Sequence, residues 1–238
     1  MRNVRYWEID EARGRAVVLM VFYHFIFDLF YPENNQFYWL AILTATFFIL
    51  VSGVSLSVSY SRGAKFKKFI KRGLKLLVLG LFITAVSFLL LENGAILFGI
   101  LHFFGVSSFL IYPFLKNSRK NITLFIGVSF ILVGMFFWNV SINTNYLIWV
   151  GLTPRVFYTF DFFPTFPWFG LLLIGTYIGS HMYPNGKRGF KIHEPDNIMS
   201  KTLQLLGKNS LIIYFIHQPI MILLLYVLGM KSIIFVLI

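Results

Sequence analysis

The sequence places an imidazole and a carboxylate one helical turn apart inside an apolar segment, RGRAVVLMVFYHFIFDLF, residues 13–30. His24 and Asp28 are four residues apart, a spacing that puts both side chains on one face of a helix. A carboxylate beside a histidine fixes the tautomer of the ring and raises its basicity, which is what a general base needs. We therefore expect acid–base chemistry here, with His24 as the base and Asp28 orienting it.

Two more charged residues extend this face toward the start of the segment. Asp10 and Arg13 are three residues apart, and the eleven residues from Arg13 to His24 make almost three full turns. At a rise of 1.5 Å per residue, His24 lies about 16 Å along the helix from Arg13. Ionisable groups at such a depth are costly in lipid, so this face is expected to turn toward the protein interior or an aqueous cavity.

Three other histidines lie in or next to apolar segments. His102, in LFGILHFFGVSS, is expected at a depth similar to that of His24, so both could line one cavity. His217, in YFIHQPIM, is expected nearer the cytoplasmic half, and His181 at a helix end is expected at the membrane interface. A single buried histidine is often a neutral hydrogen-bonding group between helices, and that alternative stays open for His102 and His217.

The elements that must position these residues are membrane helices. Of the residues 58% are hydrophobic and only 13% are charged, far from the roughly 25% charged of a soluble domain. Apolar runs long enough to cross a hydrocarbon core of about 30 Å recur along the chain. We count seven: Gly14–Tyr31, Phe37–Tyr60, Leu74–Leu91, Ile96–Leu115, Ile122–Trp138, Thr165–Met182 and Leu211–Leu228. The prediction is an all-α integral membrane protein, a polytopic bundle of about seven transmembrane helices that forms one domain over residues 1–238.

The positive charge follows the predicted topology. The formal net charge is +12, but 19 of the 21 Lys and Arg residues fall on one set of alternating connections, and only Arg155 and Lys231 on the other. This is the asymmetry of the positive-inside rule, so we expect the N-terminus in the cytoplasm and the C-terminus outside. Topology thus explains the basic excess without a nucleic-acid partner. With no cysteine in the chain, thiolate catalysis and Cys-ligated metal are excluded, and we expect no metal.

Two connections between the helices are long. The outer stretch 139–164 is rich in aromatic residues and contains Arg155 and Asp161; it could be a headgroup loop, a re-entrant segment or a lid, and Asp161 could cap a helix or contact substrate. The stretch 183–209 is polar and is expected to be a flexible connector.

Small residues mark faces for close helix packing. Ser52, Ser55 and Ser59 surround Gly53 at helical spacing, and Gly175 and Gly179 repeat in a later segment. We interpret these as packing faces rather than as nucleophilic serines, because no G-x-S-x-G elbow is present.

Five segments in order resemble a known family. The opening EIDEARGRAVVLMVFYHFIFDLF, then FFILVSGVSLSVS, FGILHFFGVS, FFPTFPWFGLLLIGTYIG and LGKNSLIIYFIHQPI are similar to the prokaryotic branch of the heparan-alpha-glucosaminide N-acetyltransferase-like membrane proteins. That branch resembles the wider superfamily of transmembrane acyltransferases. The resemblance implies transfer of an acyl group from cytoplasmic acyl-CoA, acetyl-CoA above all, to a hydroxyl or amine of a sugar or glycolipid at the opposite face.

The resemblance also implies roles for individual residues. Arg13 and His24 match the first-helix Arg and His of the superfamily. In the animal lysosomal enzymes the position of His24 resembles an Asn, and their catalytic His lies in a luminal stretch that this chain lacks. The expected site has His24, Asp28 and His102 in catalysis, donor phosphates bound by Arg13 and a basic cluster, and acceptor contacts from Arg155, Asp161 and His217. The basic cluster comprises Lys65, Lys67, Lys68, Lys71 and Arg72.

Two other classes of protein remain as alternatives. A haem-binding electron carrier could use His24 and His102 as axial ligands. A transporter or a lipid or glycan flippase could use the buried His, Asp and Arg as a substrate or proton site. In every case we expect a multi-pass protein of the plasma membrane in contact with lipids, which could pair as a homodimer.

Overall fold

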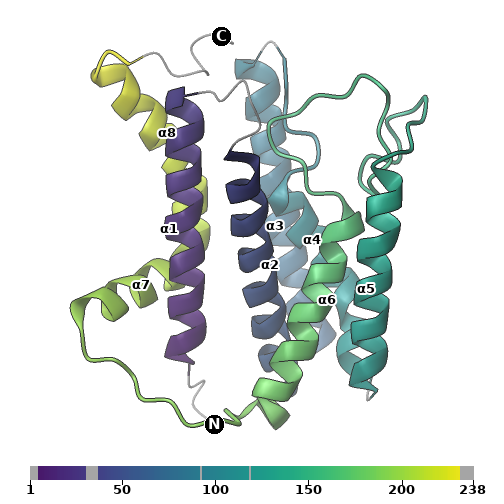
Figure 1. Cartoon of the computed structure of the whole chain (residues 1–238), viewed down its shortest axis with the longest axis vertical. Helices are drawn as coiled ribbons and strands as arrows, with labels where there is room; N and C mark the ends of the chain where they lie inside the picture. The colour runs from purple at the N-terminus through teal and green to yellow at the C-terminus, as the bar shows by residue number, and fades with distance from the viewer. Residues whose placement is uncertain (1–4, 31–36, 92, 118, 231–238) are drawn as a thin grey trace. The chain divides into compact units, whose positions relative to one another are not determined.

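A computed structural model describes residues 5–30, 37–91, 93–117 and 119–230 of the chain. Within these ranges the regular structure is helical, and the only strand-like pairings are isolated bridges (Figure 1). The helices are α1 Trp7–Phe30, α2 Tyr38–Ser61, α3 Phe66–Leu90, α4 Ile100–Lys116, α5 Lys120–Phe137, α6 Thr165–Met182, the short 3₁₀ helix η2 Pro184–Gly186, α7 Ile198–Lys208 and α8 Ser210–Val227. Lys231 lies outside the described residues. The all-α prediction is confirmed.

Each predicted apolar run corresponds to a helix, in whole or in part. Four helices, α2, α3, α5 and α8, are long and apolar enough to cross a membrane, and α4 is a shorter apolar helix. These helices agree with a membrane bundle. The number of seven spans and the sides on which the two termini lie stay predictions.

Two sequence predictions about helix boundaries are wrong. α3 begins at Phe66 rather than Leu74, so most of the basic cluster is helical; Lys and Arg are good helix formers, and hydropathy alone does not detect a helix that starts outside the membrane. The stretch 183–209 is not all a flexible connector, because it contains α7. The side chain of Asn197 accepts a hydrogen bond from the Ser200 N–H at 2.7 Å, which caps the start of that helix.

The chain divides into two compact units. The first comprises Met1–Ser52 and Phe190–Ile238, and thus α1, the first part of α2, α7 and α8; the second is Gly53–Gly189. Each is considered by itself below. That residues 1–238 form one domain stays a prediction.

In the first unit, α7 packs closely on the start of α1. Its buried residues recur at positions i, i+3, i+4 and i+7, which makes one continuous face: Ser200, Leu203, Gln204 and Gly207. A side chain at Gly14 would collide with the backbone carbonyl of Leu203, and one at Gly207 with the carbonyl of Asp10. Two glycines therefore let the backbones touch. α8 then starts beside the lower part of α1 and runs along it (Figure 1).

A buried carboxylate fixes the α1–α7 contact. Glu11 is 7% exposed; its Oε2 accepts a hydrogen bond from Ser200 Oγ at 2.6 Å, and its Oε1 pairs with Arg15. Gln204 Nε2 donates to both Ser200 Oγ and Glu194. The hydrogen bond from Ser200, together with Arg15, lowers the pKa of Glu11 although burial opposes this shift. Glu11 precedes the predicted span, so it serves as a polar anchor at the membrane edge.

In the second unit, the small-residue faces pack as predicted. A side chain at Gly53 would meet the carbonyl of Leu172 and the backbone of Gly175, and one at Gly179 would lie 2.8 Å from the Cα of Val54. α5 and α6 lie side by side, with Gly127 and Gly170 at their crossing (Figure 1). The prediction that the glycines here serve close packing is confirmed, and the packing role of the serines stays a prediction.

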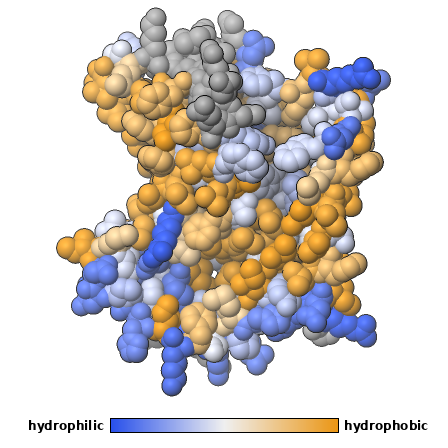
Figure 2. Space-filling view, in the orientation of Figure 1, coloured by the Kyte–Doolittle hydropathy of each residue, from blue (hydrophilic) through white to orange (hydrophobic). Residues whose placement is uncertain are grey.

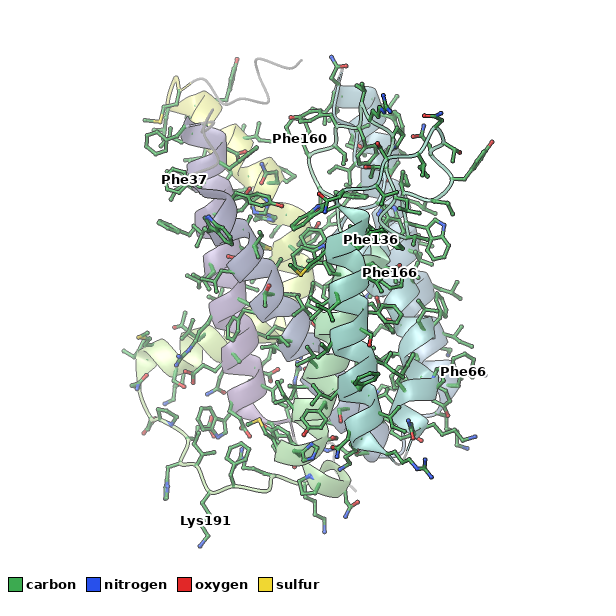
Figure 3. The ribbon with its side chains drawn as sticks, turned by 45° about the vertical axis from the view of Figure 1, so that its right-hand side comes forward. Phe37, Phe66, Phe136, Phe160, Phe166 and Lys191 are labelled. Carbon is green, nitrogen blue, oxygen red and sulfur yellow. The ribbon has the colours of Figure 1, made fainter. Side chains whose placement is uncertain are left out.

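The outer surface of α5 is hydrophobic, as a lipid-facing helix requires. Phe125 is 74% exposed and Phe136 is 67% exposed. Figure 2 shows a hydrophobic band over α5 and α6, with hydrophilic residues gathered toward the lower end of these helices. In the same unit, Phe66 at the start of α3 and Phe160 in the 139–164 stretch lie toward opposite ends (Figure 3).

Replacing Gly14 or Gly207 by alanine is expected to destabilise the first unit, because the added methyl group meets the backbone of the facing helix. Overpacking of this kind costs roughly 1–3 kcal/mol. The unfolding temperature of the purified protein in detergent measures the effect. Val18→Ala is the control, since Val18 is on α1 but 46% exposed. An equal drop in the unfolding temperature of Val18→Ala would show that the destabilisation is not specific to the α1–α7 contact.

The lowered pKa of Glu11 predicts that the contact between α1 and α7 loses stability in acid. A carboxyl group whose pKa is lowered by folding contributes stability above its unfolded pKa, about 4.3, and loses it as pH falls through the lower folded value. We expect Glu11→Gln to melt below wild type at pH 7 and this difference to shrink as the pH falls below the unfolded pKa. Asp196→Asn is the control, because it removes the charge of an exposed carboxylate just before α7. A constant difference between Glu11→Gln and wild type at all pH values would contradict the prediction.

Candidate functional site

Two histidines meet in the first unit. His24 on α1 and His217 on α8 are 193 residues apart in sequence, yet the distance from His217 Nε2 to His24 Nδ1 is 3.4 Å and the ring centroids are 4.8 Å apart. The sequence predicted His217 nearer the cytoplasmic half than His24. That prediction is wrong because α7 rests on α1 at Gly14, so α8 starts beside α1 and brings His217 to the level of His24.

The hydrogen bonds assign the same tautomer to both rings. His24 Nδ1–H donates to the carbonyl of Met20 at 2.8 Å, and His217 Nδ1–H donates to that of Tyr214 at 2.7 Å. Each Nε2 is therefore the basic nitrogen. The Nε2 of His217 faces the Nδ1–H of His24. The Nε2 of His24 has no hydrogen-bond partner among the described residues.

Asp28 has a different partner from the predicted one. It is 1% exposed, and Gln218 Nε2 donates to its two carboxylate oxygens at 2.9 and 2.8 Å. The prediction that Asp28 orients His24 is wrong, because the imidazole turns back toward Met20, the direction that helical side chains favour. Asp28 lies one turn further on and bonds to the neighbouring helix instead.

Gln218 is the residue that sequence reasoning missed. Its Oε1 is buried and has no hydrogen-bond partner in the described part of the chain. A buried amide oxygen without a partner is costly, so a hydrogen-bond donor from a ligand would satisfy it. Its position directly after His217 was the available signal. Gln218 and His217 face Asp28 and His24, so the two helices share one polar patch within an apolar unit.

Arg13 is held within the first unit. Its Nη1 lies 3.1 Å from Asp10 Oδ1, and Arg5 pairs with the other oxygen of the same carboxylate at 3.1 Å. The Arg13 side chain is 19% exposed. A donor phosphate near Arg13 would thus meet a guanidinium that Asp10 already positions.

His102 belongs to the second unit and is closely packed there. Thr84 Oγ1 donates its only proton to the Ile96 carbonyl. The hydroxyl oxygen therefore accepts a hydrogen bond from His102 Nε2–H, at 3.3 Å. The other nitrogen, Nδ1, is buried without a described partner, and the ring stacks on Phe98. A cavity shared by His24 and His102 stays a prediction, and so does a catalytic role for His102.

Asp161 caps a helix. Its Oδ2 accepts a hydrogen bond from the Ile100 N–H at 3.0 Å, at the start of α4 and 61 residues away in sequence. Thr159 Oγ1 donates to the Ala95 carbonyl nearby, which fastens the 139–164 stretch to the segment before α4. The capping alternative is confirmed, and the stretch consists of turns and bends rather than a re-entrant helix. Arg155 in the same stretch is exposed.

The predicted phosphate-binding cluster lies in the second unit. Lys65 is the exposed residue before α3, and Lys68 Nζ donates to Ser59 Oγ at 2.9 Å. Arg72 is half-buried on α3. The structure therefore groups these three residues, and it leaves Arg13 with the first unit.

Comparison with protein families gives one match over most of the chain. The family heparan-alpha-glucosaminide N-acetyltransferase, catalytic, matches residues 5–219, which include both histidines, Asp28 and Gln218. Comparisons with curated proteins and with solved structures gave no match. The resemblance inferred from five segments is thereby confirmed across both units. The chain belongs to the heparan-alpha-glucosaminide N-acetyltransferase catalytic family of membrane acyltransferases.

Proposed function

We propose that this protein transfers an acyl group from cytoplasmic acyl-CoA to a hydroxyl or amine of a sugar or glycolipid at the outer face of the plasma membrane, with His24 as general base. The observation that supports this most is the state of His24: its Nδ1–H is fixed by Met20, and its Nε2 has no hydrogen-bond partner among the described residues. A general base needs a fixed tautomer and an accessible basic nitrogen. Family membership supports the acyl transfer, with acetyl-CoA as donor.

In the proposed reaction, His24 Nε2 accepts the proton of the acceptor hydroxyl or amine as that oxygen or nitrogen bonds to the thioester carbonyl carbon. The carbon–sulfur bond then breaks, and the proton passes from Nε2 to the departing thiolate. Between these steps the imidazolium of His24 keeps its Nδ1–H directed at Met20 and at the lone pair of His217. His217 thus acts as a positioning residue that stabilises the charged ring.

Gln218 and Asp28 support the acceptor side of the reaction. Gln218 Oε1 is available to a hydroxyl or amine donor, while its amide group holds the Asp28 carboxylate. Direct transfer needs no further covalent step; an acyl-histidine on His24 would require the same Nε2. Within the second unit, we place Lys65, Lys68 and Arg72 on the donor phosphates and Arg155 on the acceptor.

A transporter would also use a buried His, Asp and Gln patch, and the two functions differ in chemistry. An acyltransferase breaks the thioester of its donor, whereas a transporter leaves it intact. Release of free thiol from acetyl-CoA, measured with the protein in lipid nanodiscs, therefore separates them. Absence of thiol release with any sugar or glycolipid acceptor would favour transport.

We expect His24→Gln to lower the rate of thiol release by about 10²–10⁴, the usual contribution of a general base. Glutamine fills similar space, so the unfolding temperature should change little. His181→Gln is the matched control, because His181 is an exposed histidine that bonds to Tyr177 at the end of α6. An unchanged rate in His24→Gln would remove this residue from the mechanism while leaving the family assignment intact.

Asp28 and Gln218 should be coupled energetically. Gln218→Leu removes the donor from a buried carboxylate and is expected to cost about 1–3 kcal/mol of stability. The double variant Asp28→Leu with Gln218→Leu should recover part of this loss, because no buried polar group is then left unpaired. Chemical unfolding of all four proteins gives the coupling energy. Simple additivity of the two single effects would mean that the hydrogen bonds contribute nothing.

A further inference from the structure

The second unit contains a polar cavity whose lining residues have no role in the proposed reaction. Its volume is about 250 Å³, and it lies where α2, α4 and α6 end and α5 begins. The lining residues that matter are Ser57 from α2, Lys116 and Asn117 from the end of α4, Lys120 and Thr123 from α5, and Asn185. By the positive-inside rule this end faces the cytoplasm.

The charged side chains that line the cavity are all basic. Lys116 and Lys120 line it, and no Asp or Glu is among the lining residues in the described ranges. Lys120 Nζ donates to the Ser180 carbonyl at 2.9 Å, which holds that ammonium group at the rim. α5 also begins here without a side-chain cap, so its N-terminal dipole adds positive potential. An anion is the matching ligand.

Two hydroxyl groups in the lining are available to a ligand. Ser57 is 3% exposed and Thr123 is 5% exposed, and the described structure gives their side chains no hydrogen bond. Neither oxygen is among the fully buried atoms that lack a partner, in agreement with their place in the cavity lining. Their neighbours Thr176 and Ser180 are satisfied, since they donate to the carbonyls of Leu173 and Tyr177. Hydroxyl groups that line a cavity beside two lysines can donate hydrogen bonds to the oxygens of a bound anion.

The size of the cavity limits that ligand. Pockets for drug-sized molecules measure roughly 300–1,000 Å³, more than the volume here. A whole nucleotide is therefore too large, whereas a phosphate or diphosphate group fits. Ammonium and hydroxyl groups are also the side-chain donors that commonly bind phosphate oxygens.

We propose that this cavity binds a phosphate group, with Lys116 and Lys120 supplying the charge and Ser57 and Thr123 donating hydrogen bonds to its oxygens. The phosphate belongs either to an anionic lipid of the cytoplasmic leaflet or to the nucleotide part of the acyl-CoA donor. The second source rests on the proposed function. Phosphate binding itself does not.

The test uses the full chain in nanodiscs of phosphatidylcholine, with pyrophosphate as the probe and the unfolding temperature as the readout. We expect pyrophosphate to stabilise wild type and the apparent affinity to fall about tenfold or more in Lys116→Gln with Lys120→Gln. Lys75→Gln with Lys187→Gln is the control, because it removes the same charge from exposed positions outside the cavity. Equal weakening in cavity and control variants, or no stabilisation of wild type, would overturn the proposal.

A second pair of variants separates binding from folding. Ser57→Ala and Thr123→Val keep the net charge and nearly the volume, so they should fold, and each should weaken pyrophosphate binding several-fold. Unchanged affinity in both would also overturn the proposal, even if the lysine variant failed to fold.

Two further binding experiments identify the source of the phosphate. Retention of phosphatidylglycerol by wild type and not by the cavity variants, seen by native mass spectrometry, assigns the site to lipid. Stabilisation by adenosine 3′,5′-bisphosphate that the same variants lose assigns it to the donor. Thiol release in wild type is measured in parallel, so failure of the acyltransferase proposal is seen independently of phosphate binding.

Discussion

The contact between two glycines, Gly14 of α1 and Gly207 of α7, is the interaction on which the candidate site depends. A side chain at either position would overlap the facing backbone, so only glycine allows α7 to lie against α1. This contact sets where α8 begins, and α8 then carries His217 to His24 and Gln218 to Asp28. Glu11 and Ser200 reinforce the contact with a buried hydrogen bond at the membrane edge. The geometry of the candidate site is thus set by packing several helical turns away from it.

Pairing of buried polar groups organises the rest of the first unit. In an apolar environment each polar side chain needs a partner, and here α1 and α8 supply partners for each other. Both histidines give their Nδ1 proton to their own helix, and the Nε2 of His217 faces the Nδ1–H of His24. Gln218 Oε1 is left buried and without a partner in the described part of the chain.

Each unit contributes a different kind of polar site. The first has imidazoles and a carboxylate, groups suited to moving protons. The second has lysines and hydroxyls around a cavity, groups suited to holding phosphate. The match to one family over residues 5–219 spans both units.

The sequence by itself determined the membrane class, the helices, the small-residue packing faces and the family, because hydropathy, helical period and motif order are local properties. It also placed His24 and Asp28 on one polar face. Only the tertiary structure decided their partners, His217 and Gln218, which lie 193 and 190 residues away. It likewise turned part of a predicted connector into α7 and made Asp161 the cap of α4. Contacts between distant segments depend on how closely backbones approach, and the period of one helix carries no information about that distance.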